Sequence, residues 1–119
     1  MDNYFNEFKS DKANKISFNQ DYSLFSMGTE RGYKIFKTFP NSESYEKILN
    51  GGISICEMSY KSNFLALIGG GKLPKYSNKK VVLYNDKKEC IESEYKFTTS
   101  VINVKFMASE PSALKIRML

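Results

Sequence analysis

The chain has 119 residues, the length of one small domain, and it carries a formal net charge of +5. Its apolar content of 41% predicts an ordered core, and because its aromatic residues are all Phe and Tyr, strands are favoured over helices. No run of about eighteen apolar residues is present, and residues 1–15 lack the apolar core of a signal peptide. We therefore expect a cytosolic protein without a membrane-spanning helix.

Side chains suited to catalysis and metal binding are scarce. The sequence contains no histidine, the commonest general base at neutral pH, and no Ser or Cys stands in a nucleophile-elbow motif. Cys56 and Cys90 have no second cysteine nearby, so each is expected to be a small buried hydrophobe that stays reduced. Glu92 and Glu94 alternate with their neighbours in the way of a solvated strand face. We expect no enzyme, no catalytic residue, no metal site and no cofactor.

Three short strands are predicted in the first half of the chain, after a polar N-terminal segment at 1–15. They are "ISFNQD", which ends in a turn, "LFSMGTE", which Gly28 closes, and "GYKIFKT", in which polar and apolar residues alternate. The segment 39–52 has Pro40 near its start and two glycines at its end. This composition predicts a loop.

The same pattern begins again at residue 53. The strands predicted here are "ISICEMSY", "FLALIGGG", "KVVLYND" and, as the outermost one, "KECIESEYKF". "VINVKF" then starts a third unit, whereas in the tail "MASEPSALKIRML" Pro111 interrupts, and no further strand is expected.

The two halves align as a repeat. Leu24 and Gly28 match Leu65 and Gly69 at an offset of about 41 residues, which is within the length of a propeller blade. The third strand of the second unit comes about seven residues later than this offset predicts, so the second unit carries an insertion. The repeat predicts an all-β fold of WD-repeat-like blades. A small antiparallel barrel that binds nucleic acid is the alternative, since it would suit the positive charge and the aromatic residues.

Several motifs between residues 16 and 106 together resemble the PROPPIN family, the WIPI-type WD-repeat proteins of autophagy. They are the "FNQD" turn, "G-x-x-IF" followed by proline, the Glu-Met strand, "LALIGGGK-x-PK" with "NKKVVLYND", and "SVINVKF". The resemblance implies a seven-bladed propeller and no nucleic-acid partner. On this basis 16–50 is blade one with its connecting loop, 51–100 is blade two, and 101–119 is the first strand of blade three with a divergent tail.

The family binds phosphatidylinositol 3-phosphate and recruits autophagy machinery to the membranes that carry it. The resemblance therefore implies a membrane-recruited adaptor, cytoplasmic and peripheral to autophagosome-precursor, endosomal or vacuolar membranes. The family's lipid-binding Phe-Arg-Arg-Gly motif is absent, because no two arginines adjoin in the sequence. We expect no lipid-binding residue in this chain, which is then either a truncated propeller or a short protein. A protein-only WD-repeat scaffold without phosphoinositide binding is the alternative function.

The inserted segment "GGGKLPKYSNKK" is the candidate site. It does not form a nucleotide loop, because Ala66 and Leu73 stand where a Walker loop needs glycine and Ser or Thr. Between Met58 and Asn85 there are five lysines and no acidic residue, which would attract an acidic peptide or a phospholipid surface. These are the lysines at positions 61, 72, 75, 79 and 80.

The resemblance assigns a partner to this loop. In the family, the matching loop carries a Pro-basic pair implicated in binding the large lipid-transfer protein of autophagosome growth, and here that pair is Pro74-Lys75. The expected partner-binding residues are Pro74, Lys75, Lys72, Lys79 and Lys80. The alternative is that the lysines only solvate a surface loop.

Overall fold

The computed structural model describes residues 15–20, 22–38, 44–59, 63–107 and 114–119. Within these ranges the chain forms ten β-strands. They are β1 (Ile16–Phe18), β2 (Leu24–Gly28), β3 (Gly32–Lys37), β4 (Ser44–Ile48), β5 (Ile53–Met58), β6 (Phe64–Gly69), β7 (Lys80–Asn85), β8 (Cys90–Lys96), β9 (Val101–Phe106) and β10 (Leu114–Met118). Among these residues, no helix has the length and apolarity needed to cross a membrane.

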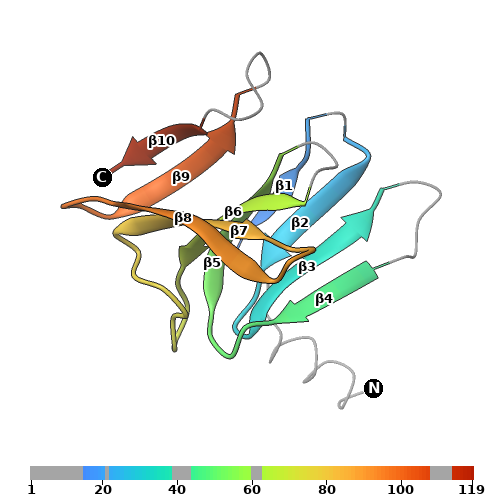
Figure 1. Cartoon of the computed structure of the whole chain (residues 1–119), viewed down its shortest axis with the longest axis horizontal. Helices are drawn as coiled ribbons and strands as arrows, with labels where there is room; N and C mark the ends of the chain where they lie inside the picture. The colour runs from blue at the N-terminus through green and yellow to red at the C-terminus, as the bar shows by residue number, and fades with distance from the viewer. Residues whose placement is uncertain (1–14, 21, 39–43, 60–62, 108–113) are drawn as a thin grey trace.

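The strands form three antiparallel sheets that follow one another along the chain (Figure 1). The first contains β1 to β4 and the second β5 to β8, each in sequential order, and the third is the β9–β10 hairpin. Each sheet is thus a meander in which consecutive strands pair, as in a propeller blade. The all-β prediction is confirmed, and the closed barrel considered as its alternative is wrong, because the sheets are separate and open.

Residues 44–48 form a strand where the sequence predicted a loop. β4 pairs with β3, and Lys47 lies opposite Tyr33. The interpretation of all of 39–52 as a loop is therefore wrong. β4 is the outer edge of its sheet, and Ile48 is 47% exposed. Because an edge strand with little buried surface does not require an apolar alternation, the sequence carried no clear signal for it.

The tail also contains a strand that the sequence analysis did not expect. β10 pairs with β9, so that Ile116 lies opposite Val104 and Leu114 opposite Phe106. Pro111 lies outside the described residues. A proline favours the end of regular structure, but the alternation of apolar and basic residues in "LKIRM" suits a strand with one half-buried face.

The second sheet is covered on both faces by its neighbours (Figure 1). One core cluster lies between the first and second sheets and contains Tyr33, Leu49, Ile53, Cys56, Met58, Leu65, Leu67, Val82 and Tyr84. A second cluster lies between the second and third sheets and contains Ile55, Ala66, Ile68, Val81, Val101, Val104 and Phe106. Burial on both faces explains why β6 reads as a continuous apolar run.

Candidate functional site

The predicted insertion is the connection between β6 and β7, at residues 70–79. It joins the second and third strands of the second sheet, as the offset in the repeat indicated. A hollow of about 570 Å³ lies beside it, lined by Gly69–Gly71 and by residues 74–78. The connection is named the β6–β7 loop below.

Backbone hydrogen bonds attach this loop to the residues that precede β5. Pro74 forms a parallel bridge with Gly52. The Gly52 amide donates to the Leu73 carbonyl at 2.7 Å, and the Gly52 carbonyl accepts from the Lys75 amide at 3.0 Å. A Cβ at Gly52 would lie 2.1 Å from the Gly70 carbonyl oxygen, so only glycine allows this approach. These bonds hold the part of the loop between Gly70 and Lys75 against the residues that precede β5.

A side chain from the first sheet provides another attachment. The Glu30 carboxylate, in the turn between β2 and β3, accepts a hydrogen bond from the Lys72 amide at 2.8 Å. Next to it, Gly71 adopts a φ of +88°. A Cβ at Gly71 would lie 2.5 Å from a Glu30 carboxylate oxygen. The sequence analysis missed Glu30, because it is separated from the loop by about forty residues and no local pattern connects them.

The predicted lysines divide into two groups. Lys72, Lys75 and Lys79 are exposed, and within the described part of the chain none has an ion-pair partner. Lys80 differs, because its Nζ lies 2.5 Å from the carboxylate of Glu94 on β8. This hydrogen bond and the lysine charge lower the pKa of Glu94. Three of the four predicted lysines are thus exposed without an ion-pair partner in the described chain, whereas the fourth, Lys80, is paired with Glu94 within the sheet.

The tip of the loop combines these charges with apolar surface. Leu73 is 79% exposed and Pro74 is also exposed, between Lys72 and Lys75. Lys61, the remaining lysine of the predicted set, lies outside the described residues. The tip therefore presents apolar and cationic groups together to any molecule that approaches it.

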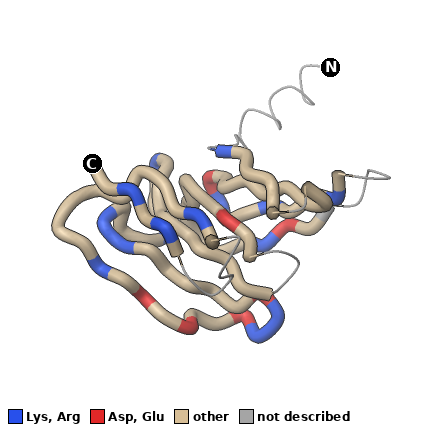
Figure 2. The backbone as a smooth tube through the Cα atoms, turned by 90° about the horizontal axis from the view of Figure 1, so that it is seen from above, with Lys and Arg blue, Asp and Glu red and all other residues tan. Residues whose placement is uncertain are grey.

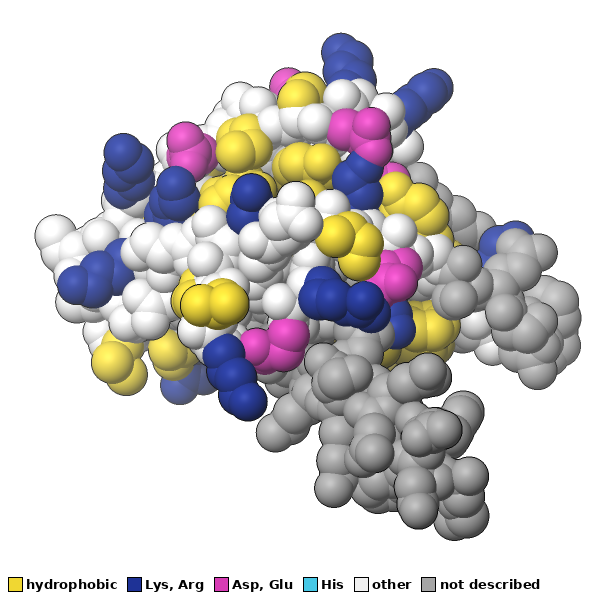
Figure 3. Space-filling view, turned by 90° about the horizontal axis from the view of Figure 1, so that it is seen from below, with side chains coloured by type: hydrophobic (Ala, Val, Ile, Leu, Met, Phe, Trp, Pro, Cys, Tyr) yellow, Lys and Arg dark blue, Asp and Glu magenta, His cyan; other side chains and the backbone are white. Residues whose placement is uncertain are grey.

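On the face shown in Figure 3, the described basic side chains do not gather into one continuous surface. Lys and Arg positions are interspersed with Asp and Glu along the backbone (Figure 2), and on the face shown in Figure 3 acidic side chains lie among the basic ones. A nucleic-acid groove needs a basic surface that follows the phosphate backbone. This face does not favour the nucleic-acid alternative.

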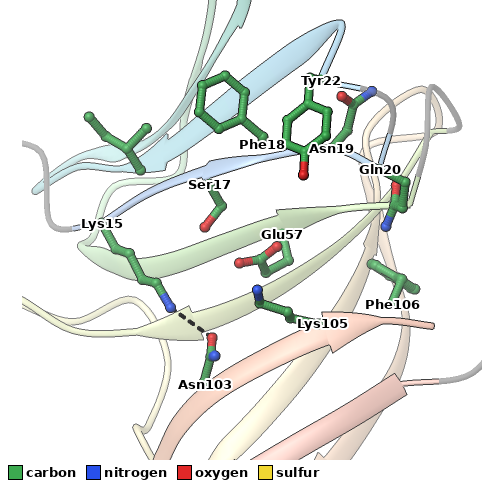
Figure 4. A pocket seen from close by; sticks show the side chains of 11 residues that line it. Lys15, Ser17, Phe18, Asn19, Gln20, Tyr22, Glu57, Asn103, Lys105 and Phe106 are labelled. Atoms are coloured by element: carbon green, nitrogen blue, oxygen red, sulfur yellow. Dashed lines mark hydrogen bonds between the residues drawn. The ribbon is translucent and has the colours of Figure 1, made fainter. Parts of the chain in front are cut away.

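A second pocket, of about 370 Å³, lies among β1, β5 and β9 (Figure 4). Glu57 on β5 points into it, and its Oε1 atom is buried without a hydrogen-bond partner. The pKa of Glu57 is raised, because the effect of burial exceeds the opposite effects of a hydrogen bond from Ser17 and of the charges of Lys15 and Lys105. Lys15 Nζ donates to Asn103 Oδ1 at 2.7 Å across the same pocket. These polar and charged side chains come from β5, from β9 and from the residue before β1, so they connect the first strands of all three sheets.

The two cysteines are free and differ in burial. Cys56 on β5 is 1% exposed, as expected of a small hydrophobe. Cys90 on β8 is exposed, so its interpretation as a buried hydrophobe is wrong. Glu92 and Glu94 are exposed on the same edge strand, which confirms their solvated position. Among the described residues, no group of three or more His, Cys, Asp or Glu side chains is placed to hold a metal ion.

Comparison with known proteins places these sheets among autophagy-related propellers. No family model matches the chain. It is 38% identical over 96 residues to Autophagy-related protein 18 of Yarrowia lipolytica, covering 81% of this chain and 24% of that protein. It is 43% identical over 77 residues to SVP1-like protein 2 of Schizosaccharomyces pombe, covering 64% of this chain and 21% of that protein. The chain thus spans about a quarter of the length of the curated relatives it matches.

Solved structures share the fold. The crystal structure of Hsv2 from Kluyveromyces marxianus superposes with a TM-score of 0.72 at 20% identity, covering 92% of this chain and 33% of that one. The β-propeller domain of Cps50 (Swd1) from Myceliophthora thermophila gives a TM-score of 0.59 at 14% identity, covering 92% and 32%. The three stacked sheets are therefore part of a β-propeller.

Proposed function

Because the chain belongs to the PROPPIN family and forms part of its propeller, we propose that it acts within a complete propeller as a membrane-recruited adaptor of autophagy. Its partner site is the β6–β7 loop. The blades are assigned as 16–50 and 51–100, with a third beginning at 101. The observation that carries the proposal is the tip of this loop, where exposed lysines without ion-pair partners in the described chain flank the exposed Leu73 and Pro74.

The relatives support a role in autophagy machinery. Two of them carry the name Autophagy-related protein 18, from Yarrowia lipolytica and Saccharomyces cerevisiae. A propeller of this fold, KlAtg21, has been solved in complex with the coiled coil of AgAtg16, with a TM-score of 0.56 to this chain. A protein of this fold therefore takes a protein partner. For this protein we propose a separate partner interaction at Pro74-Lys75, with the lipid-transfer protein of autophagosome growth.

The geometry of the loop suits such a role in two ways. The backbone bonds to Gly52 hold the tip in one conformation, so that less conformational entropy is lost when a partner binds. Lys75 and Lys79 then supply positive charge, which raises the rate of encounter with an acidic segment. Phosphoinositide membranes are engaged only by the complete propeller.

The test is the double substitution Pro74→Ala with Lys75→Glu in the full-length protein. It removes the fixed φ of the proline and reverses one charge, so we expect a clear loss of the lipid-transfer partner in a pull-down. Folding is expected to change by under about 0.5 kcal/mol, because both residues are exposed. Vesicle recruitment, measured on the same protein, is expected to survive.

The control is Lys88→Glu, which reverses an exposed charge in the turn at the other end of β7. Lys80→Glu is a poorer control, because it also breaks the pair with Glu94. Unchanged partner binding in the double variant would reduce the β6–β7 loop to a solvated connection.

A further inference from the structure

The turn between β2 and β3 is a rigid support beside the partner loop. The Thr29 amide donates to the Gly32 carbonyl at 2.9 Å, and the Thr29 hydroxyl accepts from the amides of Arg31 and Gly32 at 3.2 and 3.0 Å. Thr29 is fully buried. Its carbonyl accepts from the Ile53 amide at 2.9 Å, which attaches the turn to the start of β5 in the next sheet. Glu30 therefore projects from a fixed backbone.

Glu30 and the residues preceding β5 hold the β6–β7 loop from two sides. Gly52 bonds to Leu73 and Lys75, whereas Glu30 bonds to the Lys72 amide that comes just before. A hydrogen bond from an amide to a carboxylate is stronger than one between neutral groups. Lys72, Leu73 and Lys75 therefore face outward from a segment that is fixed at both of its ends.

Gly71 makes room for this contact. Its φ of +88° is strained for a residue with a side chain, and a Cβ there would meet the Glu30 carboxylate at 2.5 Å. A loop that served only as a solvated connection would need neither this conformation nor a carboxylate from another sheet. The two features fit each other, and both act on the backbone of Lys72.

We propose that Glu30 is a positioning residue for the partner site: from the first blade it fixes the conformation in which the loop of the second blade presents Lys72, Leu73 and Lys75. The inference rests on the proposed function of the loop. Partner binding then depends on a residue that does not itself contact the partner.

The experiment compares Glu30→Ala with Glu30→Gln and Glu46→Ala in the full-length protein. Glu30→Ala removes the acceptor, so we expect hydrogen exchange of the Lys72 amide to accelerate by about tenfold or more. Glu30→Gln keeps an acceptor oxygen without the charge and should retain part of the protection. Glu46→Ala is the control, because it also removes a carboxylate from the first sheet, and among the described residues Glu46 forms its ion pairs with Arg31 at 3.2 Å and Lys34 at 4.0 Å, which are not in the loop.

Partner pull-down on the same variants separates the two proposals. Weakened binding by Glu30→Ala, with Glu46→Ala at wild-type level, supports the inference. Two outcomes would overturn the inference and leave the proposed function standing. One is that hydrogen exchange of the Lys72 amide is unchanged in Glu30→Ala. The other is that Glu30→Ala binds the partner normally although the double variant Pro74→Ala/Lys75→Glu does not. Unchanged binding in both Glu30→Ala and the double variant overturns the proposed function instead.

A variant on the loop side of the same contact distinguishes loss of the contact from a general folding defect. Gly71→Ala disturbs the same contact from the loop side, because its Cβ displaces the Glu30 carboxylate. We expect it to reproduce the faster exchange at Lys72 and the weaker partner binding, with the thermal transition of the propeller retained. Wild-type exchange and binding in Gly71→Ala would contradict the inference.

Discussion

Residues of the same type have different surroundings in this chain, depending on the strand that carries them. Cys56 is on the innermost strand of the second sheet and Cys90 is on the outermost one, with two strands between them. Three inter-strand steps of about 4.8 Å separate them by about 14 Å, beyond the limit of about 7 Å for a disulfide. Burial raises the pKa of the Cys56 thiol. The pKa of Cys90 is raised by local desolvation and by its neighbour Glu92.

Thiol labelling tests this placement. In the native protein we expect N-ethylmaleimide to modify Cys90 and to leave Cys56 unmodified until the protein unfolds, because Cys56 is 1% exposed. A raised pKa means less thiolate at a given pH, so labelling of Cys90 should be slow near neutral pH and should accelerate as the pH rises. Mass spectrometry of tryptic peptides measures both. An intramolecular Cys56–Cys90 bond, or equal labelling of the two, would contradict the strand assignment.

At the scale of the elements, the contact between the first two sheets includes a buried polar link. The Tyr33 hydroxyl on β3 donates to the carboxylate of Asp86, which follows β7. Tyr33 is fully buried, and its ring packs edge-on against Tyr84 with 6.3 Å between centroids. Burial, and then the bond to Asp86, raise the pKa of Tyr33. Two residues that lie 53 positions apart in the sequence thus join the first sheet to the second.

Tyr33→Phe tests the strength of this link. The substitution keeps the ring and removes the hydroxyl, which leaves the Asp86 carboxylate without that donor. We expect the free energy of unfolding to fall by about 1–3 kcal/mol, as measured by urea denaturation of the full-length protein. Tyr95→Phe is the matched control, because Tyr95 is 44% exposed on an edge strand and its change should stay within about 0.5 kcal/mol. Equal effects of the two substitutions would show that the link contributes little.

In the molecule as a whole, the outer face of the first sheet carries apolar side chains that are partly exposed among the described residues. Phe18 is 51% exposed, and Phe25 stacks on Phe36 with ring centroids 4.8 Å apart. In a propeller each sheet packs against the next, so this is the kind of face that a neighbouring blade covers. We therefore expect the 119-residue chain alone to associate more readily than a complete propeller.

Any binding of the chain to lipid is expected to depend on its overall charge. The isolated chain has a net charge of +5 and no adjoining arginines, so we expect it to bind anionic vesicles by charge alone. Vesicles with phosphatidylinositol 3-phosphate should bind no better than vesicles of equal charge with another anionic lipid. Binding should weaken with salt, as the Debye length falls from about 10 Å at 0.1 M to about 3 Å at 1 M. A preference for the 3-phosphate headgroup that persists at high salt, measured by vesicle co-sedimentation, would reveal a site in this chain.

From the sequence alone it was possible to predict eight of the ten described strands, the repeat of about 41 residues, the insertion between β6 and β7, and the resemblance to the family. These are local properties, because alternation and turn residues act between neighbours in the chain. β4 and β10 escaped prediction, since one is a mostly polar edge and the other follows a proline. The tertiary structure was needed to show that Lys80 is paired, that Cys90 is exposed and that Glu30 holds the loop at Lys72. The pairing of Lys80 and the exposure of Cys90 depend on how β7 and β8 pair at the edge of one sheet. The contact of Glu30 depends on which sheets lie side by side, and no spacing along the chain encodes a contact between residues about forty positions apart.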